Sequence, residues 1–359
     1  MGFFKTHVTT RADRISNFQM TVCDYGTPVT DICGTIKISP NVINWKDFYS
    51  REIRTTTKQG KSKTTNISYK YYVYTELALG EGVQDIGAIW VGDTKYSSLR
   101  QANSTNEAPG FPLVLNTTGK KSPFMAQKYP DQAVDYDGLA YLHANGGGSS
   151  GIYLGENSAA VPSYAFEVKG QLRNTGNGID VNPADYIMHI LRKINIWNGV
   201  DDESTVVANI DDFRLYCKEK DFLISSPSEN NNQRKAQEII KELCNLFDIY
   251  FFWSNDQFKI AIKDNVAVPG GEWKPNKTII YDLGPDDMLV QNDGACVSFS
   301  RKDSSEVYNR FTVDFENRAN DYESESVSYE FVKDIEETGL RQQSTIQGKY
   351  FYTRERASR

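Results

Sequence analysis

The sequence predicts an α+β protein in which β-structure dominates. Aromatic residues make up 12% of the 359 residues and include 21 Tyr and 18 Phe, and aromatic residues are enriched in strands. Short runs of alternating apolar residues, broken by turn residues, occupy both the N-terminal and the C-terminal parts of the chain. Helical periodicity occurs in the middle. We therefore expect β modules on either side of a small α/β module.

The length of the chain predicts more than one domain, because single cores rarely keep growing beyond roughly 250 residues. We expect a first β module at residues 1–170, an α/β module at 171–265 and the start of a second β module at 266–359.

Two long exposed loops are expected in the first module, at about residues 51–68 and 96–137. Residues 51–68 are polar and rich in Thr, with five Lys and Arg residues, as is typical of a hairpin tip or flexible loop. These cations could touch a phosphate backbone, but a solvated loop is the preferred interpretation. Residues 96–137 have few periodic apolar positions, and long loops of this kind often contact a partner.

Later in the first module, residues 138–142 and 164–168 predict strands. The glycine-rich segment 145–151 between them predicts a flexible tip. It is not a phosphate loop, because no Lys-Ser/Thr pair follows and no helix begins there.

Three helices and a hairpin are expected in the middle of the chain. Asn182 and Pro183 begin a helix that ends near residue 195, and Asp211 is a candidate cap for a second. A third helix, capped by Asn232 or a neighbour, has one apolar stripe: Ala236, Ile239, Ile240, Leu243, Leu246 and Phe247. Residues 249–253 and 257–262 flank Ser-Asn-Asp, which predicts a tight β-hairpin.

The last part of the chain predicts a linker and then further strands. The linker begins at Ala267, and strands are expected to resume at Thr278. Residues 308–316 and 325–331 alternate in the manner of strands.

Bulk properties exclude several functional classes. The formal net charge of −7 supplies no overall basic field, so specific nucleic-acid binding is not expected. No stretch approaches the roughly 20 apolar residues of a membrane-spanning helix, and the N-terminus lacks a secretory signal. The cysteines are odd in number and form no Cys-x-x-Cys pair, which is typical of buried thiols in a reducing cytoplasm: Cys23, Cys33, Cys217, Cys244 and Cys296.

The sequence predicts no enzyme, no catalytic, cofactor-binding or metal-binding residue, and no cofactor. Its three histidines, His7, His143 and His189, are far apart and show no metal-ligand spacing. Each is expected to be structural. The adjacent acids at 201–202, 211–212 and 286–287 lie near expected turns or caps, which explains them better than glycoside hydrolysis. Common nucleophile, zinc and nucleotide motifs are absent from the sequence.

A family resemblance rests on fragments that keep one order along the chain. Gly26-Thr27-Pro28-Val29 is followed by a strand that starts at Gly34, and then by Asn41-Val42-Ile43-Asn44-Trp45. Residues 72–82 and 86–90 then give an aromatic strand, a Leu-Gly-Glu-Gly turn and an Ile-Trp strand ending in Trp90. Together with the later strands, the Asn-Pro helix start and the module from Asp211 to Ile262, this order resembles central tail hub and tip proteins of long-tailed phages and gene transfer agents.

The resemblance implies a fold and a role. Tube-like β-barrel or sandwich domains, with an inserted helix-helix-hairpin module, would form a trimeric ring that caps the tail tube. Expected partners are the tail tube or distal tail ring protein, the tape-measure protein and receptor-binding or tail-fibre proteins, at the distal end of the virion tail. The protein would be assembled in the host cytoplasm. The ending, from Gly339-Leu340-Arg341 to Arg359, resembles a helix start that normally continues into further strands, so we expect a second polypeptide to complete the hub.

Two other functions remain open. One is a spike-type hub of a contractile injection or secretion system. The other is a carbohydrate-binding or cell-wall-degrading tip protein, in which Tyr and Trp would act as sugar platforms. A nucleic-acid contact through residues 51–63 is a weaker third possibility.

Overall fold

The computed structural model describes residues 7–16, 18–24, 26–60, 62–104, 113–145, 151–157, 159–194, 203–227, 234–278, 281–289, 300, 303 and 307–359. The chain divides into two compact units. Unit 1 contains residues 1–174 and 226–233, and unit 2 contains residues 175–225 and 234–359.

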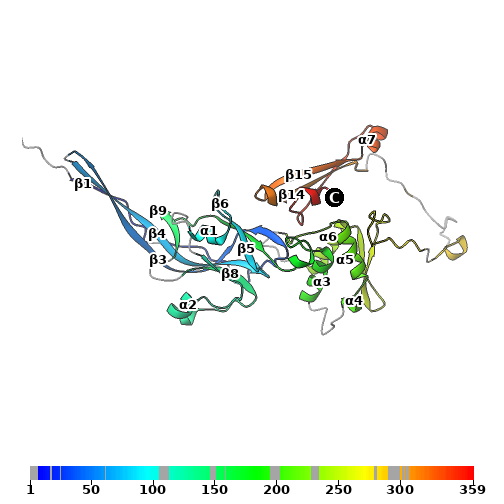
Figure 1. The fold of residues 1–359 in the computed structure, drawn as a ribbon, viewed down its shortest axis with the longest axis horizontal. Helices are drawn as coiled ribbons and strands as arrows, with labels where there is room; N and C mark the ends of the chain where they lie inside the picture. The colour runs from blue at the N-terminus through cyan, green and yellow to red at the C-terminus, as the bar shows by residue number, and fades with distance from the viewer. Residues whose placement is uncertain are drawn as a thin grey trace, which may run out of the picture. The chain divides into compact units, whose positions relative to one another are not determined.

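The main sheet of unit 1 is organised around β4, a strand of 20 residues (Figure 1). β4 pairs along its length with the antiparallel strand β3, and its inner half also pairs with β8 and β9. β7 continues the sheet beyond β8, and β1 pairs in parallel with the outer half of β4. The strands are β1 (His7–Arg11), β3 (Asn41–Gln59), β4 (Ser62–Glu81), β7 (Leu113–Asn116), β8 (Leu139–Ala144) and β9 (Ile152–Glu156).

A second sheet of unit 1 has the order β2-β10-β5-β6. Its strands are β2 (Thr35–Ile38), β5 (Asp85–Val91), β6 (Thr94–Tyr96) and β10 (Tyr164–Lys169). In β10 the buried residues alternate with half-buried ones, as expected for a strand with one face in the core. Trp90 is buried at 7% exposure, with the ammonium of Lys37 4.4 Å from its ring centroid. Trp45 is half-buried and meets Phe18 edge to face. Both tryptophans therefore act as packing residues.

The α/β part of unit 2 contains the expected helices and hairpin. α3 (Pro183–Lys193) begins where the sequence predicts, with the Asn182 side chain accepting a hydrogen bond from the Ala184 amide. α4 (Glu203–Val206) and β11 (Val207–Ala208) precede α5 (Ile210–Glu219). α6 (Ala236–Leu246) leads into the hairpin of β12 (Ile249–Ser254) and β13 (Gln257–Ile262). The sheet order is β11-β13-β12.

The remaining sheet of unit 2 has the order β15-β14-β16. β14 (Arg310–Asn317) pairs antiparallel with β15 (Glu323–Glu330) and parallel with β16 (Gln343–Gln347). The short helices of this part of the chain are α7 (Val332–Thr338) and α8 (Arg354–Ala357), and a 3₁₀ turn at Arg318–Asn320 follows β14; another 3₁₀ turn, Pro285–Asp287, lies earlier in the chain.

The structure corrects several expectations from the sequence. The sheets are open in the described parts of the chain, with no closed barrel, because each sheet ends in strands that have a neighbour on one side only. Residues 51–59 and 62–68 form the outer parts of β3 and β4, which agrees with the hairpin alternative and not with a long flexible loop. Residues 96–137 are also not one loop, because they contain α1 (Leu99–Ser104), β7, α2 (Pro123–Lys128) and a 3₁₀ turn at Pro130–Gln132. Thr278 is in no strand, residues 279–280 of the expected strand lie outside the described residues, and the next described strand is β14.

The capping predictions were less accurate than the helices themselves. The residue before α5 is Asn209, whose backbone is left-handed and whose side chain makes no capping bond, while Asp211 lies in the first turn. The residue before α6 is Lys235, again without a side-chain cap. Asn232 and residues 146–150 lie outside the described residues.

Candidate interaction surfaces

An arm formed by the outer parts of β3 and β4, with β1 alongside β4, is the most extended feature of unit 1. From Tyr69 outward, β4 has no ladder with β8 or β9; it pairs with β3 on one side and, at residues 63–67, with β1 on the other. The ladder between β3 and β4 continues without a register shift from Tyr49 to Gln59, where Gln59 faces Ser62. The arm is therefore ordered up to its turn (Figure 1).

Alternation places the charges of the outer arm on one of its faces. Arg54, Lys58 and Lys63 all lie on the same face, since Lys58 faces Lys63 across the ladder and Arg54 is four residues from Lys58. The register with β1 adds Arg11, opposite Ile67, and His7, opposite Lys63. The other face of the outer arm bears Val8, Ile53 and uncharged polar side chains: Thr10, Thr55, Thr57, Gln59, Ser62, Thr64, Asn66 and Ser68.

A single carboxylate balances part of this charge. The Glu52 carboxylate accepts a hydrogen bond from Arg54 Nε at 2.5 Å and another from Arg11 Nη2 at 2.9 Å. The hydrogen bond from Arg54, followed by that from Arg11, lowers the pKa of Glu52 below its ordinary value. Among the described residues, Lys58 and Lys63 have no acidic partner. The two lysines therefore keep their full charge available to a ligand.

A second surface lies along β12 in unit 2. Among the described strands, β12 pairs only with β13, so its other edge is open. Tyr250, Phe252 and Trp253 are 59%, 45% and 60% exposed on this short strand. An open groove of about 580 Å³ lies between β12 and α6, with Ile240 and Cys244 in its wall.

This edge has the physical properties of a buried contact in an assembly. An unpaired apolar strand presents backbone donors and acceptors that can pair with another strand, and isolated proteins usually protect such edges with charge, proline or a covering element. The residues of β12, Ile-Tyr-Phe-Phe-Trp-Ser, contain none of these protections. The sequence predicts the hairpin correctly, but its edge position depends on the sheet order and could not be read from the local pattern.

Unit 1 also contains a buried carboxylate that the sequence gives no reason to single out. Glu76 is 2% exposed and accepts hydrogen bonds from four neutral groups, at distances of 2.8 to 3.2 Å. The donors are Tyr74 Oη, Ser122 Oγ, Tyr136 Oη and Asn44 Nδ2. Burial, and then the negative charge of Glu76, raise the pKa values of Tyr74 and Tyr136 above the ordinary tyrosine value. Both phenols therefore remain donors, and Glu76 attaches the segment after β7 to the main sheet.

The candidate residues for chemistry are dispersed. His7 is exposed in β1, and His143 is buried in β8 with its Nδ1 3.1 Å from the Ala144 carbonyl oxygen. Asp211 and Asp212 lie in the first turn of α5, and Asp286 and Asp287 lie in a 3₁₀ turn. Asp201 and Asp202 lie outside the described residues. The described acids therefore lie in the first turn of a helix and in a 3₁₀ turn, and Asp211 is not the cap that the sequence predicts.

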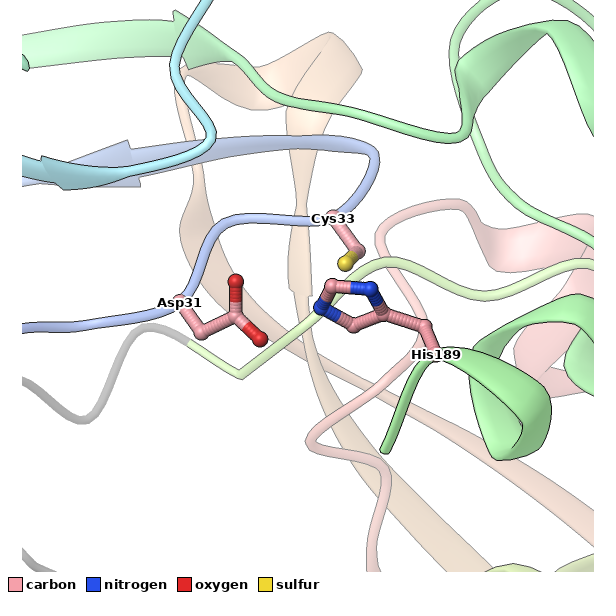
Figure 2. Close-up of side chains that lie close together, drawn as sticks. All are labelled: Asp31, Cys33 and His189. Carbon is pink, nitrogen blue, oxygen red and sulfur yellow. The ribbon is translucent and has the colours of Figure 1, made fainter. Parts of the chain in front are cut away.

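Three polar side chains that can ligate metals are drawn in Figure 2. Asp31 and Cys33 lie on the segment before β2 in unit 1, where Asp31 Oδ1 accepts a hydrogen bond from Gln171 Nε2 at 2.9 Å. His189 lies on α3 in unit 2. We assign no metal site to residues of separate units. The cysteines that the structure describes are free thiols, and burial raises the pKa of Cys217.

Comparison with known proteins gives two results. Residues 235–359 match the family described as "Putative phage tail protein". The structure resembles a chain of the solved "Virion of native gene transfer agent (GTA) particle", with a TM-score of 0.62, 14% sequence identity, and coverage of 97% of this chain and 74% of that chain. The chain shares the fold of this virion protein. No curated protein matches the sequence.

The family match covers much of unit 2. It begins just before α6 and includes the β12–β13 hairpin and the β14–β16 sheet. It therefore contains the exposed β12 edge, whereas the arm of unit 1 lies outside the matched residues. The helices in the described ranges are too short or too polar to cross a membrane.

Proposed function

We propose that this protein is a structural subunit of a phage-type tail hub, with no catalytic role. The observation that carries the proposal is the similarity of fold over 97% of the chain to a component of a gene transfer agent virion. The match of residues 235–359 to a phage tail family supports the same assignment.

In this proposal three copies form a ring at the distal end of the tail. The ring caps the tail tube and anchors tip or fibre proteins for host attachment and genome delivery. Its partners are the distal tail ring or tube protein, the tape-measure protein and receptor-binding fibres. The open edges of the β sheets support an assembled state, because pairing with a neighbouring copy would cover them.

Electron microscopy of the purified full chain tests this proposal directly. We expect rings with threefold symmetry that bind the end of tail tubes. Monomers at every concentration, with no attachment to tubes, would contradict it. A ring that continues into a β-helical spike would instead identify the spike-type hub of a contractile machine.

A second candidate function follows from the exposed aromatic side chains of β12. Tyr250 and Trp253 are large, exposed rings of the kind that stack on sugars. A carbohydrate-binding tip protein would bind a glycan array as a monomer. Substitution of Trp253 by Ala would then abolish glycan binding, whereas the hub proposal predicts no such binding.

A further inference from the structure

The outer arm of unit 1 bears a concentrated positive charge that the ring proposal does not use. We propose that this arm binds the sugar-phosphate backbone of nucleic acid, without sequence specificity. The binding surface, called here the basic face, consists of Arg11, Arg54, Lys58 and Lys63. This proposal rests on the structure of the arm alone and does not depend on the oligomeric state of the protein.

The basic face is produced by strand register. Side chains alternate between the two faces of a strand, so a cation one position earlier or later in β3 would lie on the opposite face. Instead, every charged side chain of the described outer arm, from Glu52 to the turn, lies on one face. Lys58 lies four positions after Arg54, so their Cα atoms are about 13 Å apart along the strand.

The pairing of two lysines favours a ligand that supplies negative charge. Lys58 and Lys63 lie directly opposite each other, and like charges in this position destabilise a ladder. No described acidic side chain relieves the repulsion. A phosphate between the two ammonium groups would turn this repulsion into two favourable contacts.

The surrounding side chains favour a phosphate backbone over an acidic protein. Phosphate oxygens accept hydrogen bonds from Lys, Arg and Thr side chains, and Thr56 and Thr65 lie between the cations of the basic face with their hydroxyls 3.3 Å apart. Protein interfaces are centred on aromatic or other apolar anchors and are depleted in lysine. Among the described residues, Ile67 is the apolar side chain that shares this face with the cations, and no aromatic ring lies outward of Tyr69.

The charge on the rest of the chain also favours the arm as the place where a polyanion binds. The formal net charge is −7, so the acidic remainder repels a polyanion and leaves the arm as the favourable point of approach. Backbone contact of this kind carries no sequence information. The proposal therefore agrees with the sequence-based expectation that specific nucleic-acid binding is absent.

Salt-dependent binding by the full chain tests the proposal. The probes are a labelled DNA duplex of mixed sequence and the corresponding single strand, measured by fluorescence anisotropy over a salt series. We expect the logarithm of the affinity to fall linearly with the logarithm of salt concentration, by about 0.9 for each duplex phosphate neutralised and about 0.7 for a single strand. Binding of both probes supports recognition of the shared backbone.

Matched variants separate the basic face from charge in general. Lys58→Gln with Lys63→Gln should weaken duplex binding at least about tenfold and make the salt slope shallower by about 2. Lys58→Arg with Lys63→Arg should retain both affinity and slope. The control is Lys274→Gln with Lys277→Gln, two exposed lysines of unit 2, which should change little.

Several results would overturn the proposal. These are salt-independent binding, an equal loss of affinity in the control variant, or equal affinity for poly-glutamate of the same charge, which would indicate an acidic protein ligand. Thermal unfolding of the Gln variant checks that the arm is intact. It should unfold at the same or a higher temperature than the parent, because the substitutions remove the repulsion between the paired lysines.

Discussion

Asp180 shows how one residue can hold distant parts of unit 2 together. Its carboxylate accepts hydrogen bonds from Ser225 Oγ and from Arg318 Nη2, each at 2.7 Å. It also forms an ion pair with Arg356. Burial alone would raise the pKa of Asp180, but the hydrogen bonds and charge of Arg318, with Ser225 and Arg356, lower it below the ordinary value. The cluster therefore connects the segment before α3 with the end of β14 and with α8.

This lowered pKa predicts an acid-sensitive unit 2. Because the folded-state pKa lies below the unfolded value of about 3.9, the carboxylate stabilises the fold above that pH, and the stabilisation is lost as pH falls through the folded value. Asp180→Asn should cost about 3 kcal/mol at neutral pH, since it removes the buried carboxylate that pairs with both the Arg318 and the Arg356 guanidinium groups.

Hydrogen exchange of the β14 amides, followed from neutral to acidic pH, measures this effect. Protection in the parent should decrease on acidification, and Asp180→Asn should start lower and change less. The exposed Asp282→Asn serves as the control. Parallel pH profiles for the parent and Asp180→Asn would show that Asp180 does not determine the acid response.

Glu76 provides the second prediction at this scale. Glu76→Leu should destabilise unit 1 by more than about 3 kcal/mol, because several buried donors would lose their acceptor at about 1 to 3 kcal/mol each. Limited proteolysis should then cut the segment between β7 and β8 faster. Glu156→Gln, which alters a half-exposed carboxylate paired with Lys70, should cost less than about 1 kcal/mol. Equal protease resistance of Glu76→Leu and the parent would contradict this role.

The residues behind these two predictions explain what sequence reasoning could not find. The partners of Glu76 include Ser122, 46 residues away, and those of Asp180 include Arg356, 176 residues away. Periodicity and turn chemistry report on neighbours along the chain, and neither indicates which distant donor meets a buried acid. The same limit hid the open edge of β12, which depends on the order of strands within the sheet.

At the scale of elements, local patterns predicted well where local chemistry decides the structure. The hairpin of β12 and β13 turns at Asn255 and Asp256, which both have positive φ, as a tight two-residue turn requires. The Thr-rich, polar sequence of the arm fitted both a hairpin tip and a flexible loop, and the structure shows the hairpin. Its strands are formed by pairing with β1 and with each other, and threonine favours strands.

The turn of this hairpin gives a stabilising prediction. Asp256 has φ of 60°, a conformation that costs an ordinary residue energy and costs glycine little. Asp256→Gly creates the Asn-Gly pair preferred in such turns and should stabilise the hairpin by about 0.5 to 1 kcal/mol. Urea unfolding should show a higher midpoint with an unchanged slope. Asp256→Val, with a β-branched side chain at the same position, should lower the midpoint.

At the scale of the whole molecule, the exposed edge of β12 connects the fold with the proposed ring. An apolar edge strand leaves backbone hydrogen-bonding groups unpaired in an isolated subunit. In an assembly, a strand of another copy can pair with these groups and cover the apolar side chains. Phe252 is 45% exposed on this edge, so a lysine there can reach solvent in the subunit while opposing close approach of a second apolar strand. Phe252→Lys should therefore leave the subunit folded and prevent ring formation.

Sedimentation velocity and electron microscopy measure this outcome together. The parent should form rings, and Phe252→Lys should remain monomeric with a circular dichroism spectrum like that of the parent. Tyr281→Lys is the matched control, because it places the same charge on a more exposed aromatic residue that belongs to no described strand. Rings formed equally well by Phe252→Lys would remove β12 from the contact between copies, and failure of all three proteins to form rings would count against the hub itself.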